Sequence, residues 1–239
     1  MKFECASCGM VHTIDEDEAR AFGRDFLAAI DGGGHRFGRG ALPAMPVPVS
    51  DFFVPGGGKM FACLVADNAE GQRRLLFAFS GMLGRRWIWP GWVEPCFDAH
   101  AWRELEATYD PEIAALSDRL AAQGRSQRLR EERALRSREL MARYHALYRI
   151  SGPTGRQHGL AEIVGAGKMV SGMGDCCAPK LLNAAYRRGW KPRSMVEFFV
   201  GMSRRPGVRE HGREYPPCDD KCGPLLPYLH CPTWAVASQ

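Results

Sequence analysis

Residues 13–30 carry apolar side chains at helical spacing and acidic side chains in the first turn. This pattern predicts a helix, and either Thr13 or Asp15 can serve as its N-cap. Two apolar runs of strand length follow at 60–66 and 75–80. The polar segment between them predicts a turn, so the two runs are expected to form a β-hairpin.

A second helical pattern covers residues 111–149 and is rich in arginine. Pro111 suits the first turn of this helix, and the apolar phase breaks near Gly124. Glutamates at helical contact spacings partly neutralise the arginines, which favours a solvated helical hairpin or a bracing helix. The alternative is a face that contacts the RNA backbone.

From residue 175 onward the pattern alternates between helix and strand. Residues 176–188 predict a helix, 194–201 a buried strand, and 222–230 a short helix. Together with the hairpin, this order predicts an α/β fold whose mixed sheet is flanked by helices. The expected organisation is a zinc-knuckle-like N-terminus (1–12), a first core half (13–104), an arginine-rich helical insertion (105–150) and a cysteine-rich core half (151–239).

The composition is that of an ordinary globular protein and excludes wholesale disorder, with 45% hydrophobic and 25% charged residues among 239. A net charge of +5 permits an anionic partner without requiring one. No apolar run approaches the roughly 18 residues of a membrane span, and the N-terminus lacks a secretory signal pattern. We therefore expect a cytoplasmic chain, in which nine cysteines indicate metal binding or catalysis before disulfides.

Four of the six tryptophans lie between residues 81 and 104. One interpretation is a hydrophobic corner under a long loop. The other is a surface that stacks on nucleic-acid bases, because Arg85 and Arg86 are close in sequence.

Three cysteines lie where a metal site would need them. Cys176 starts a predicted helix, and Cys218 and Cys222 lie just before and at the start of the last helix. Helix N-termini favour thiolates, and both helix starts can reach the same end of the sheet. Three thiolates with one open position form the ligand set of a zinc deaminase, whereas small buried unliganded cysteines are the alternative.

Two further residues are candidates at this site. Cys177 points about 100° away from Cys176 on a regular helix, so it can ligate only if the helix start is irregular. His211 is a candidate fourth ligand or proton carrier, and a surface histidine is the alternative interpretation.

The N-terminal Cys5-x-x-Cys8, followed by a glycine and His12, resembles one knuckle of a zinc ribbon. A structural zinc ion needs two more ligands besides this pair of cysteines. His12 can supply one, and Cys231 or His230 can supply the other if the chain ends meet.

The run SGMGDCCAPKLLNAAYRRGWKPRSMVEFFVG, followed by VREHGREYPPCDDKCGPLL, resembles a cysteine-containing domain. That domain precedes the catalytic domain of some long bacterial pseudouridine synthases of the RluA type. GKMFACLVADN and LLFAFSGMLG are similar to its hairpin, so the resemblance covers about residues 58–98 and 171–230. We expect no synthase catalytic domain in this chain. The resemblance therefore implies RNA modification and a pseudouridine synthase as a partner, not synthase activity.

The order of elements is also similar to the cytidine-deaminase-like fold. In that family the helix after the hairpin begins with His or Cys, any residue, then Glu, and a C-x-x-C opens the next helix. Here Ala178 stands at the glutamate position, and the cysteine pair is one residue wider. The resemblance implies a zinc ion and a nucleobase substrate, but the proton carrier must come from elsewhere.

Two carboxylates can replace the missing glutamate. Glu197 lies in an otherwise apolar strand between the two cysteine helices, where an edge position or a buried ion pair is the alternative explanation. Asp175 directly precedes Cys176, and a helix N-cap is its alternative role.

Two hypotheses of function follow. The first is a zinc-dependent hydrolase of deaminase type that acts on a nucleobase in RNA or in a nucleotide. The second is a non-catalytic, zinc-stabilised RNA-binding module, favoured by Ala178, the arginine-rich helix and the tryptophan-rich loop. An open metal position near a carboxylate would favour the first, and a fourth protein ligand the second.

Overall fold

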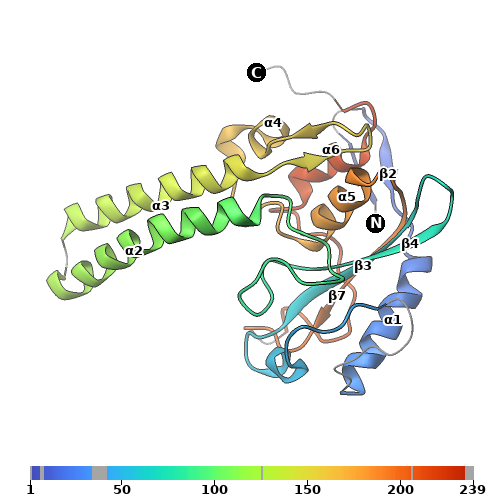
Figure 1. Cartoon of the computed structure of the whole chain (residues 1–239), viewed down its shortest axis with the longest axis horizontal. Coiled ribbons are helices and arrows are strands. Elements are labelled where there is room, and N and C mark those ends of the chain that lie inside the picture. The colour runs from blue at the N-terminus through green and yellow to red at the C-terminus, as the bar shows by residue number, and fades with distance from the viewer. Residues whose placement is uncertain (1, 6–7, 34–41, 125, 206, 235–239) are drawn as a thin grey trace.

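The structure, a computed structural model, describes residues 2–5, 8–33, 42–124, 126–205 and 207–234 (Figure 1). Its principal elements are α1 (Asp17–Asp31), β3 (Lys59–Asp67), β4 (Arg73–Phe79), α2 (Ala99–Gln123), α3 (Gln127–Leu147), α5 (Cys177–Arg187), β7 (Lys191–Val200) and α6 (Leu226–His230). The short elements are β1 (Lys2–Glu4), β2 (Val11–Thr13), η1 (Val49–Phe53), β5 (Ile150–Ser151), β6 (Gln157–His158), α4 (Leu160–Val164), η2 (Ala166–Lys168) and η3 (Gly223–Leu225). The α/β class is therefore confirmed.

The central sheet has three strands in the order β4-β3-β7. Strand β3 runs antiparallel to both neighbours, with Phe61 opposite Phe79 on one side and Phe198 on the other. The expectation of a mixed sheet is wrong for the described strands, which pair only in antiparallel fashion. Strand β7 runs in the same direction as β4 and would form a parallel pair with it, but β7 pairs with β3 instead. A single parallel bridge joins Asp15 to Ser194 at the β7 edge.

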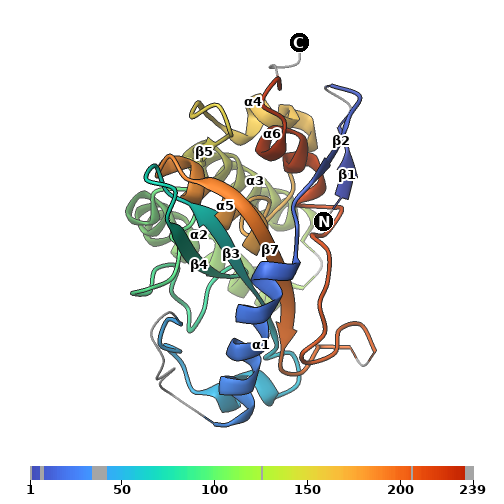
Figure 2. The same cartoon turned by 90° about the vertical axis from the view of Figure 1, so that its right-hand side faces the viewer.

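Helices cover both faces of this sheet (Figure 2). Alternate residues of β3 point to opposite sides, as strand geometry requires. Ala62 and Leu64 pack in the cluster that contains the apolar side chains of α5. Phe61 and Cys63 pack in the cluster that contains Phe26 of α1. The three layers place the first turn of α5 directly over the sheet.

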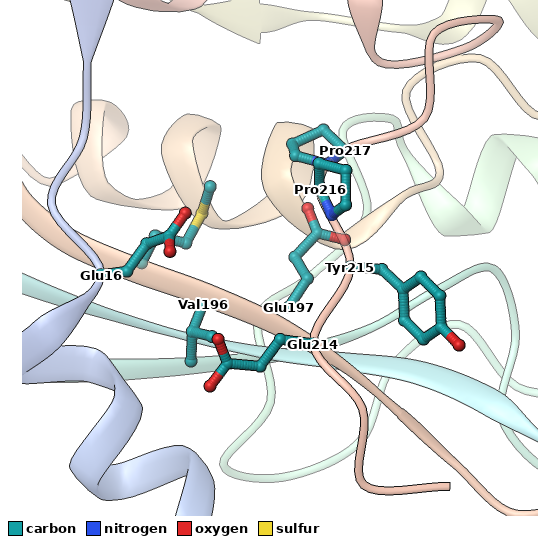
Figure 3. A pocket seen from close by; sticks show the side chains of 8 residues that line it. Glu16, Val196, Glu197, Glu214, Tyr215, Pro216 and Pro217 are labelled. Atoms are coloured by element: carbon teal, nitrogen blue, oxygen red, sulfur yellow. The ribbon is translucent and has the colours of Figure 1, made fainter. Parts of the chain in front are cut away.

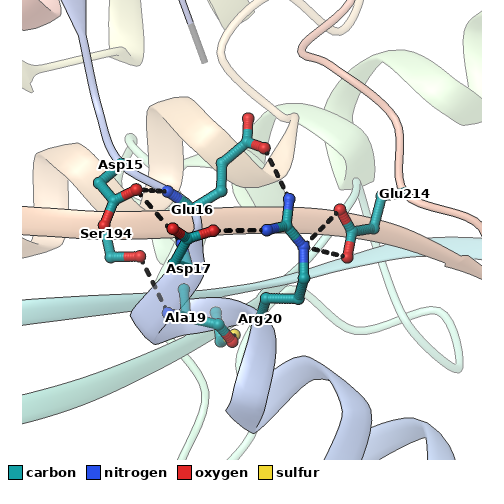
Figure 4. A network of polar contacts seen from close by, with 8 residues as sticks. Asp15, Glu16, Asp17, Ala19, Arg20, Ser194 and Glu214 are labelled. Carbon is teal, nitrogen blue, oxygen red and sulfur yellow. Dashed lines mark hydrogen bonds and ion pairs between the residues drawn. The ribbon is translucent and has the colours of Figure 1, made fainter.

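Polar contacts hold helix α1 against β7 and the segment that follows it (Figure 4). The Ala19 amide donates to the Ser194 hydroxyl of β7 at 2.9 Å. The first residue of α1 is Asp17 and its N-cap is Glu16, so neither Thr13 nor Asp15 is the N-cap, contrary to the prediction. The Asp15 carboxylate accepts from the Glu16 amide at 2.8 Å, just outside the helix. Arg20 donates to both carboxylate oxygens of Glu214, at 2.8 and 3.0 Å. The segment that leads from β7 to Cys218 is thereby held against α1.

Helices α2 and α3 form a hairpin that projects from the sheet layers (Figure 1). The helical pattern begins at Ala99, earlier than expected, because the Asp98 carboxylate caps it by accepting from the His100 amide at 2.8 Å. Pro111 therefore lies inside α2 and not in a first turn. No described helix is long and apolar enough to cross a membrane.

The tryptophan-rich loop folds as a hydrophobic corner. Trp87 and Trp92 are each 6% exposed. Trp102 stacks on Tyr144 of α3, with ring centroids 3.7 Å apart. The rings of Trp87 and Trp92 are therefore not free to stack on bases, whereas Trp89 is half-buried with the Arg86 guanidinium 5.0 Å from its ring centroid.

Candidate metal centres

Three cysteines gather at the N-terminal end of α5. Cys176 is the N-cap residue of this helix, and Cys218 and Cys222 belong to the segment after β7. The Sγ atoms of Cys176 and Cys218 lie 3.8 Å apart, and those of Cys218 and Cys222 lie 3.6 Å apart. All three sulfurs lie within 4.8 Å of one another. We call this set the α5 cluster.

Backbone hydrogen bonds at the edge of the sheet bring two of these cysteines to α5. After β7 the chain doubles back, and the Tyr215 amide donates to the Glu197 carbonyl at 3.0 Å. Two prolines then lead into Cys218, whose carbonyl accepts from the Cys222 amide at 3.2 Å. This turn puts the two sulfurs close together.

The sulfur spacing and chemistry fit a tetrahedral metal ion. At a zinc–sulfur distance of about 2.3 Å, tetrahedral geometry separates two sulfurs by about 3.8 Å. Hydrogen bonds with Cys176 and Cys222 lower the pKa of Cys218, while the hydrogen bond with Cys218 raises the pKa of Cys176 to about 12. The shifts run in opposite directions because the three thiols are hydrogen-bonded to one another, and a bound cation would replace protons of these thiols.

Glu197 approaches the α5 cluster from the sheet. Because side chains alternate along β7, Glu197 shares a face with Met195 and Phe199, which pack in the α5 layer. Its side chain is 6% exposed, and its Oε1 has no hydrogen-bond partner in the described part of the chain. Figure 3 shows this carboxylate beside Pro216, whereas Glu214 points to the opposite side of the strand.

The surroundings of Glu197 raise the pKa of its carboxyl group. Burial, and then the charge on Cys218, raise the pKa of the Glu197 carboxyl to about 8, while the nearby Ala178 amide opposes this. A carboxyl that titrates near neutral pH can both accept and release a proton. A buried acid with one oxygen left without a hydrogen-bond partner is costly to keep, which is typical of a functional site.

The α5 cluster and Glu197 line one cavity of about 320 Å³, within the usual range for small-ligand sites. Met60, Ser80 and Pro216 also line it. So do two cations that the sequence pattern did not indicate, Arg209 and Lys221. Lys221 directly precedes the candidate ligand Cys222 in the sequence, so its place near the site could have been inferred. The sequence around Arg209 contains no pattern that would have indicated its place in the cavity.

Asp175 and Cys177 lie next to the cluster without joining it. The Asp175 carboxylate accepts from the Tyr148 hydroxyl at 2.5 Å, and burial raises the pKa of its carboxyl. Asp175 is not the N-cap, because Cys176 occupies that position. The Cys177 thiol donates to the Met60 carbonyl at 3.4 Å, and burial raises the pKa of that thiol well above its ordinary value.

The structure does not bring His211 to the α5 cluster. Its Nε2 contacts the Asp31 carboxylate at 2.9 Å, at the C-terminal end of α1. Its Nδ1 accepts from the Gly201 amide at 3.1 Å. His211 therefore ties α1 to the end of β7, and its expected role as a fourth ligand or proton carrier is corrected.

Lys180 is a buried anchor that the sequence analysis missed. It is 0% exposed, and its Nζ donates to the carbonyls of Phe79 and Gly81, at 2.8 and 3.3 Å. Burial lowers the pKa of this ammonium group. The sequence does contain one indication of its burial, because Lys180 lies among apolar residues in the first turns of the predicted helix. By tying α5 to the end of β4, Lys180 positions Cys176.

A second group of donors lies where the chain ends meet. Its members are Cys5, Cys8, His12 and Cys231, whose donor atoms lie within 4.8 Å of one another. Of the two C-terminal candidates, the structure brings Cys231 and not His230 into this group. We call this set the terminal cluster. Both clusters can hold a metal ion.

Comparison of the chain with family models, with curated proteins and with solved structures finds no match.

Proposed function

We propose that the chain is a zinc-dependent hydrolase of deaminase type, acting on a nucleobase in RNA or in a nucleotide. One observation carries this proposal. The buried carboxylate of Glu197, with an unpartnered oxygen, lines the same cavity as the three thiols of the α5 cluster. Three protein ligands leave one coordination position for a reactant, as catalytic zinc sites do.

A zinc ion held by Cys176, Cys218 and Cys222 would supply the Lewis acidity that activates water for attack on a ring carbon. Glu197 would take one proton from the attacking water as the carbon–oxygen bond forms, and give it to the ring nitrogen, whose double bond to that carbon is lost. It would then take the second proton from the new hydroxyl group and give it to the amino group, whose carbon–nitrogen bond breaks as the carbonyl forms. The products are the carbonyl form of the base and ammonia. Met60 and Pro216 exclude bulk water from part of the cavity.

The position of Glu197 also supports the finer proposal of a cytidine-deaminase-like fold. In the alignment that the resemblance implies, Ala178 stands where the family has its proton-carrying glutamate. The Ala178 amide lies close enough to the Glu197 carboxylate to oppose the rise in the pKa of its carboxyl. A carboxylate from β7 therefore occupies the space next to the residue that lacks one. The hairpin, cysteine helix and following strand are in the order that the resemblance implies.

The test is an ammonia-release assay on the zinc-loaded chain, with cytidine, adenosine and guanosine monophosphates and single-stranded RNA as substrates. Glu197→Gln should keep its zinc and lower turnover by about 10²–10⁴-fold, the usual contribution of a general acid–base group. Glu70→Gln is the control, because Glu70 is an exposed glutamate on the turn between β3 and β4 and does not line the cavity. It should retain the turnover of the unmodified chain.

Two outcomes would overturn this proposal. If Glu197→Gln turns over substrate as the unmodified chain does, Glu197 is not the proton carrier. If the zinc-loaded chain releases ammonia from none of these substrates, the deaminase mechanism fails.

A non-catalytic RNA-binding module is the second candidate, and one observation favours it. Arg128, Arg130 and Arg138 are exposed on α3 and form no ion pair with other described residues. Unpaired arginines along a projecting helix can neutralise phosphates. The resemblance to the RluA-type domain points to the same polymer. Salt-dependent RNA binding with no ammonia release would favour this function.

A further inference from the structure

The terminal cluster joins segments from opposite ends of the chain. Cys5, Cys8 and His12 lie in the first thirteen residues, and Cys231 is the C-cap residue of α6. Cys5 and Cys231 are each 1% exposed. Four donors that are distant in sequence lie within 4.8 Å of one another. The C-terminal segment is held in the core by Leu225, Tyr228 and Leu229. Among the described side chains before Ile14, only that of Cys5 is buried, so the place of the N-terminal hairpin against that segment needs a further cause.

The backbone preorganises the N-terminal half of this cluster. The Gly9 amide donates to the Cys5 carbonyl at 2.7 Å, and the Cys5 amide donates to the Met10 carbonyl at 2.9 Å. Gly9 has a φ of +68°, which a glycine adopts readily at such a turn. Strands β1 and β2 pair on either side of the turn. The hairpin therefore aims its donors at one point before any ion binds.

The donor chemistry selects the ion. Three thiols and an imidazole match a Cys₃His structural zinc site, and Cys8 Sγ lies 3.1 Å from His12 Nε2. Four protein ligands complete a tetrahedron and leave no position for water. This site therefore has the character of a closed structural centre.

One helical segment connects the terminal cluster to the α5 cluster. At its start, the amides of Leu225 and Leu226 donate to the Cys222 carbonyl at 2.8 and 3.1 Å. At its end, the Cys231 amide donates to the Pro227 carbonyl at 3.0 Å. Elements η3 and α6 thus carry a ligand of one cluster at each end.

We propose that Cys5, Cys8, His12 and Cys231 bind a second zinc ion, which closes the chain ends and fixes the η3–α6 segment that presents Cys222 to the first site. The segment also has anchors of its own. The Tyr228 hydroxyl oxygen lies 2.8 Å from the Ile150 carbonyl and 2.7 Å from the Arg156 carbonyl, and it donates its one hydrogen to either of them. Loss of the second ion therefore removes one whole metal equivalent but only weakens the first site.

The experiment measures zinc per chain by elemental analysis, the melting temperature, and zinc release to a chelator. The unmodified chain should hold two zinc ions, and Cys8→Ser should hold one and melt at a lower temperature. The remaining ion should bind about fivefold more weakly than in the unmodified chain, at the lower end of coupling between sites. Cys63→Ser is the matched control, because its hydroxyl can keep the bond to the Ala19 carbonyl, 3.2 Å long for the thiol.

If Cys8→Ser yields no folded protein, His12→Gln replaces it in the same measurements. A chain that holds one zinc ion, retained in Cys8→Ser and lost in Cys222→Ser, would overturn the second site. Two ions in Cys8→Ser would do the same. If the ion in the α5 cluster binds to Cys8→Ser as tightly as to the unmodified chain, the terminal cluster does not act on the first site through η3–α6. None of these readouts uses ammonia release, so their failure is distinct from failure of the deaminase proposal.

Discussion

The two cysteine clusters differ in the number of ligands that they offer and in what lies beside them. The α5 cluster offers three thiols at a cavity that also contains the Glu197 carboxylate. The terminal cluster offers four donors. A zinc ion with four protein ligands is closed to water, whereas three ligands leave a position for a reactant. The missing ligand and the adjacent acid, more than the cysteine count, therefore indicate chemistry.

The two clusters are also held in different ways. The α5 cluster is fixed from the interior, by the buried Lys180 and by the hydrogen bond between Tyr148 and Asp175. The terminal cluster depends on a hairpin whose strands have three residues each. We therefore expect the geometry of the α5 cluster to persist without metal. In the terminal cluster, the N-terminal hairpin keeps its own turn, but its contact with Cys231 should depend on the ion.

The sharpest contrast comes from removing one ligand of each cluster. Cys222→Ser should abolish turnover and leave one zinc ion per chain, because two thiols alone do not hold a catalytic ion. Cys231→Ser should also leave one zinc ion but keep measurable turnover. Elemental analysis and ammonia release check both variants. Equal loss of turnover in the two variants would contradict the assignment of separate roles.

Lys180→Met tests how the α5 cluster is held. The variant leaves the carbonyls of Phe79 and Gly81 without this donor, so the free energy of unfolding should fall by about 1–3 kcal/mol. Zinc should leave the α5 cluster faster and the terminal cluster at an unchanged rate. Denaturant titration and chelator kinetics measure these effects, with the exposed Lys191→Met as the control. Faster release from both clusters would show that Lys180 stabilises the whole chain and not one site.

The smallest effect on either centre should come from the helical hairpin. Reversing Arg128, Arg130 and Arg138 to Glu should leave zinc content and mononucleotide turnover unchanged. The affinity for single-stranded RNA at low salt should fall about uniformly across sequences, with a shallower salt dependence. RNA binding that is the same before and after the reversal would make the hairpin a brace alone.

Local pattern predicted much of this fold. The apolar runs gave the β3–β4 hairpin, and the change of period after residue 175 gave α5 and β7. The start of α2 was missed because the Asp98 cap precedes a segment with little periodicity. The mixed sheet was wrong because strand order depends on contacts between distant segments, which a local pattern does not contain.

The candidate site residues also fall into two groups: those that a local sequence pattern indicated and those that depend on contacts between distant segments. Cysteine spacing next to predicted helix starts was enough to group Cys176, Cys218 and Cys222. The position of His211 depends on Asp31, far away in sequence, and no local signal reports that pairing. The burial of Lys180 likewise follows from the packing of α5 over the end of β4.

X-ray absorption at the zinc edge of Cys8→Ser, which retains the α5 cluster as its metal site, tests the central claim most directly. The account predicts three sulfur neighbours at about 2.3 Å and one oxygen neighbour at about 2.0 Å. It also predicts that the oxygen neighbour remains in the double variant with Glu197→Gln, because Glu197 carries protons and does not ligate. Four sulfur neighbours, or a nitrogen ligand in place of oxygen, would show a closed site and contradict the account.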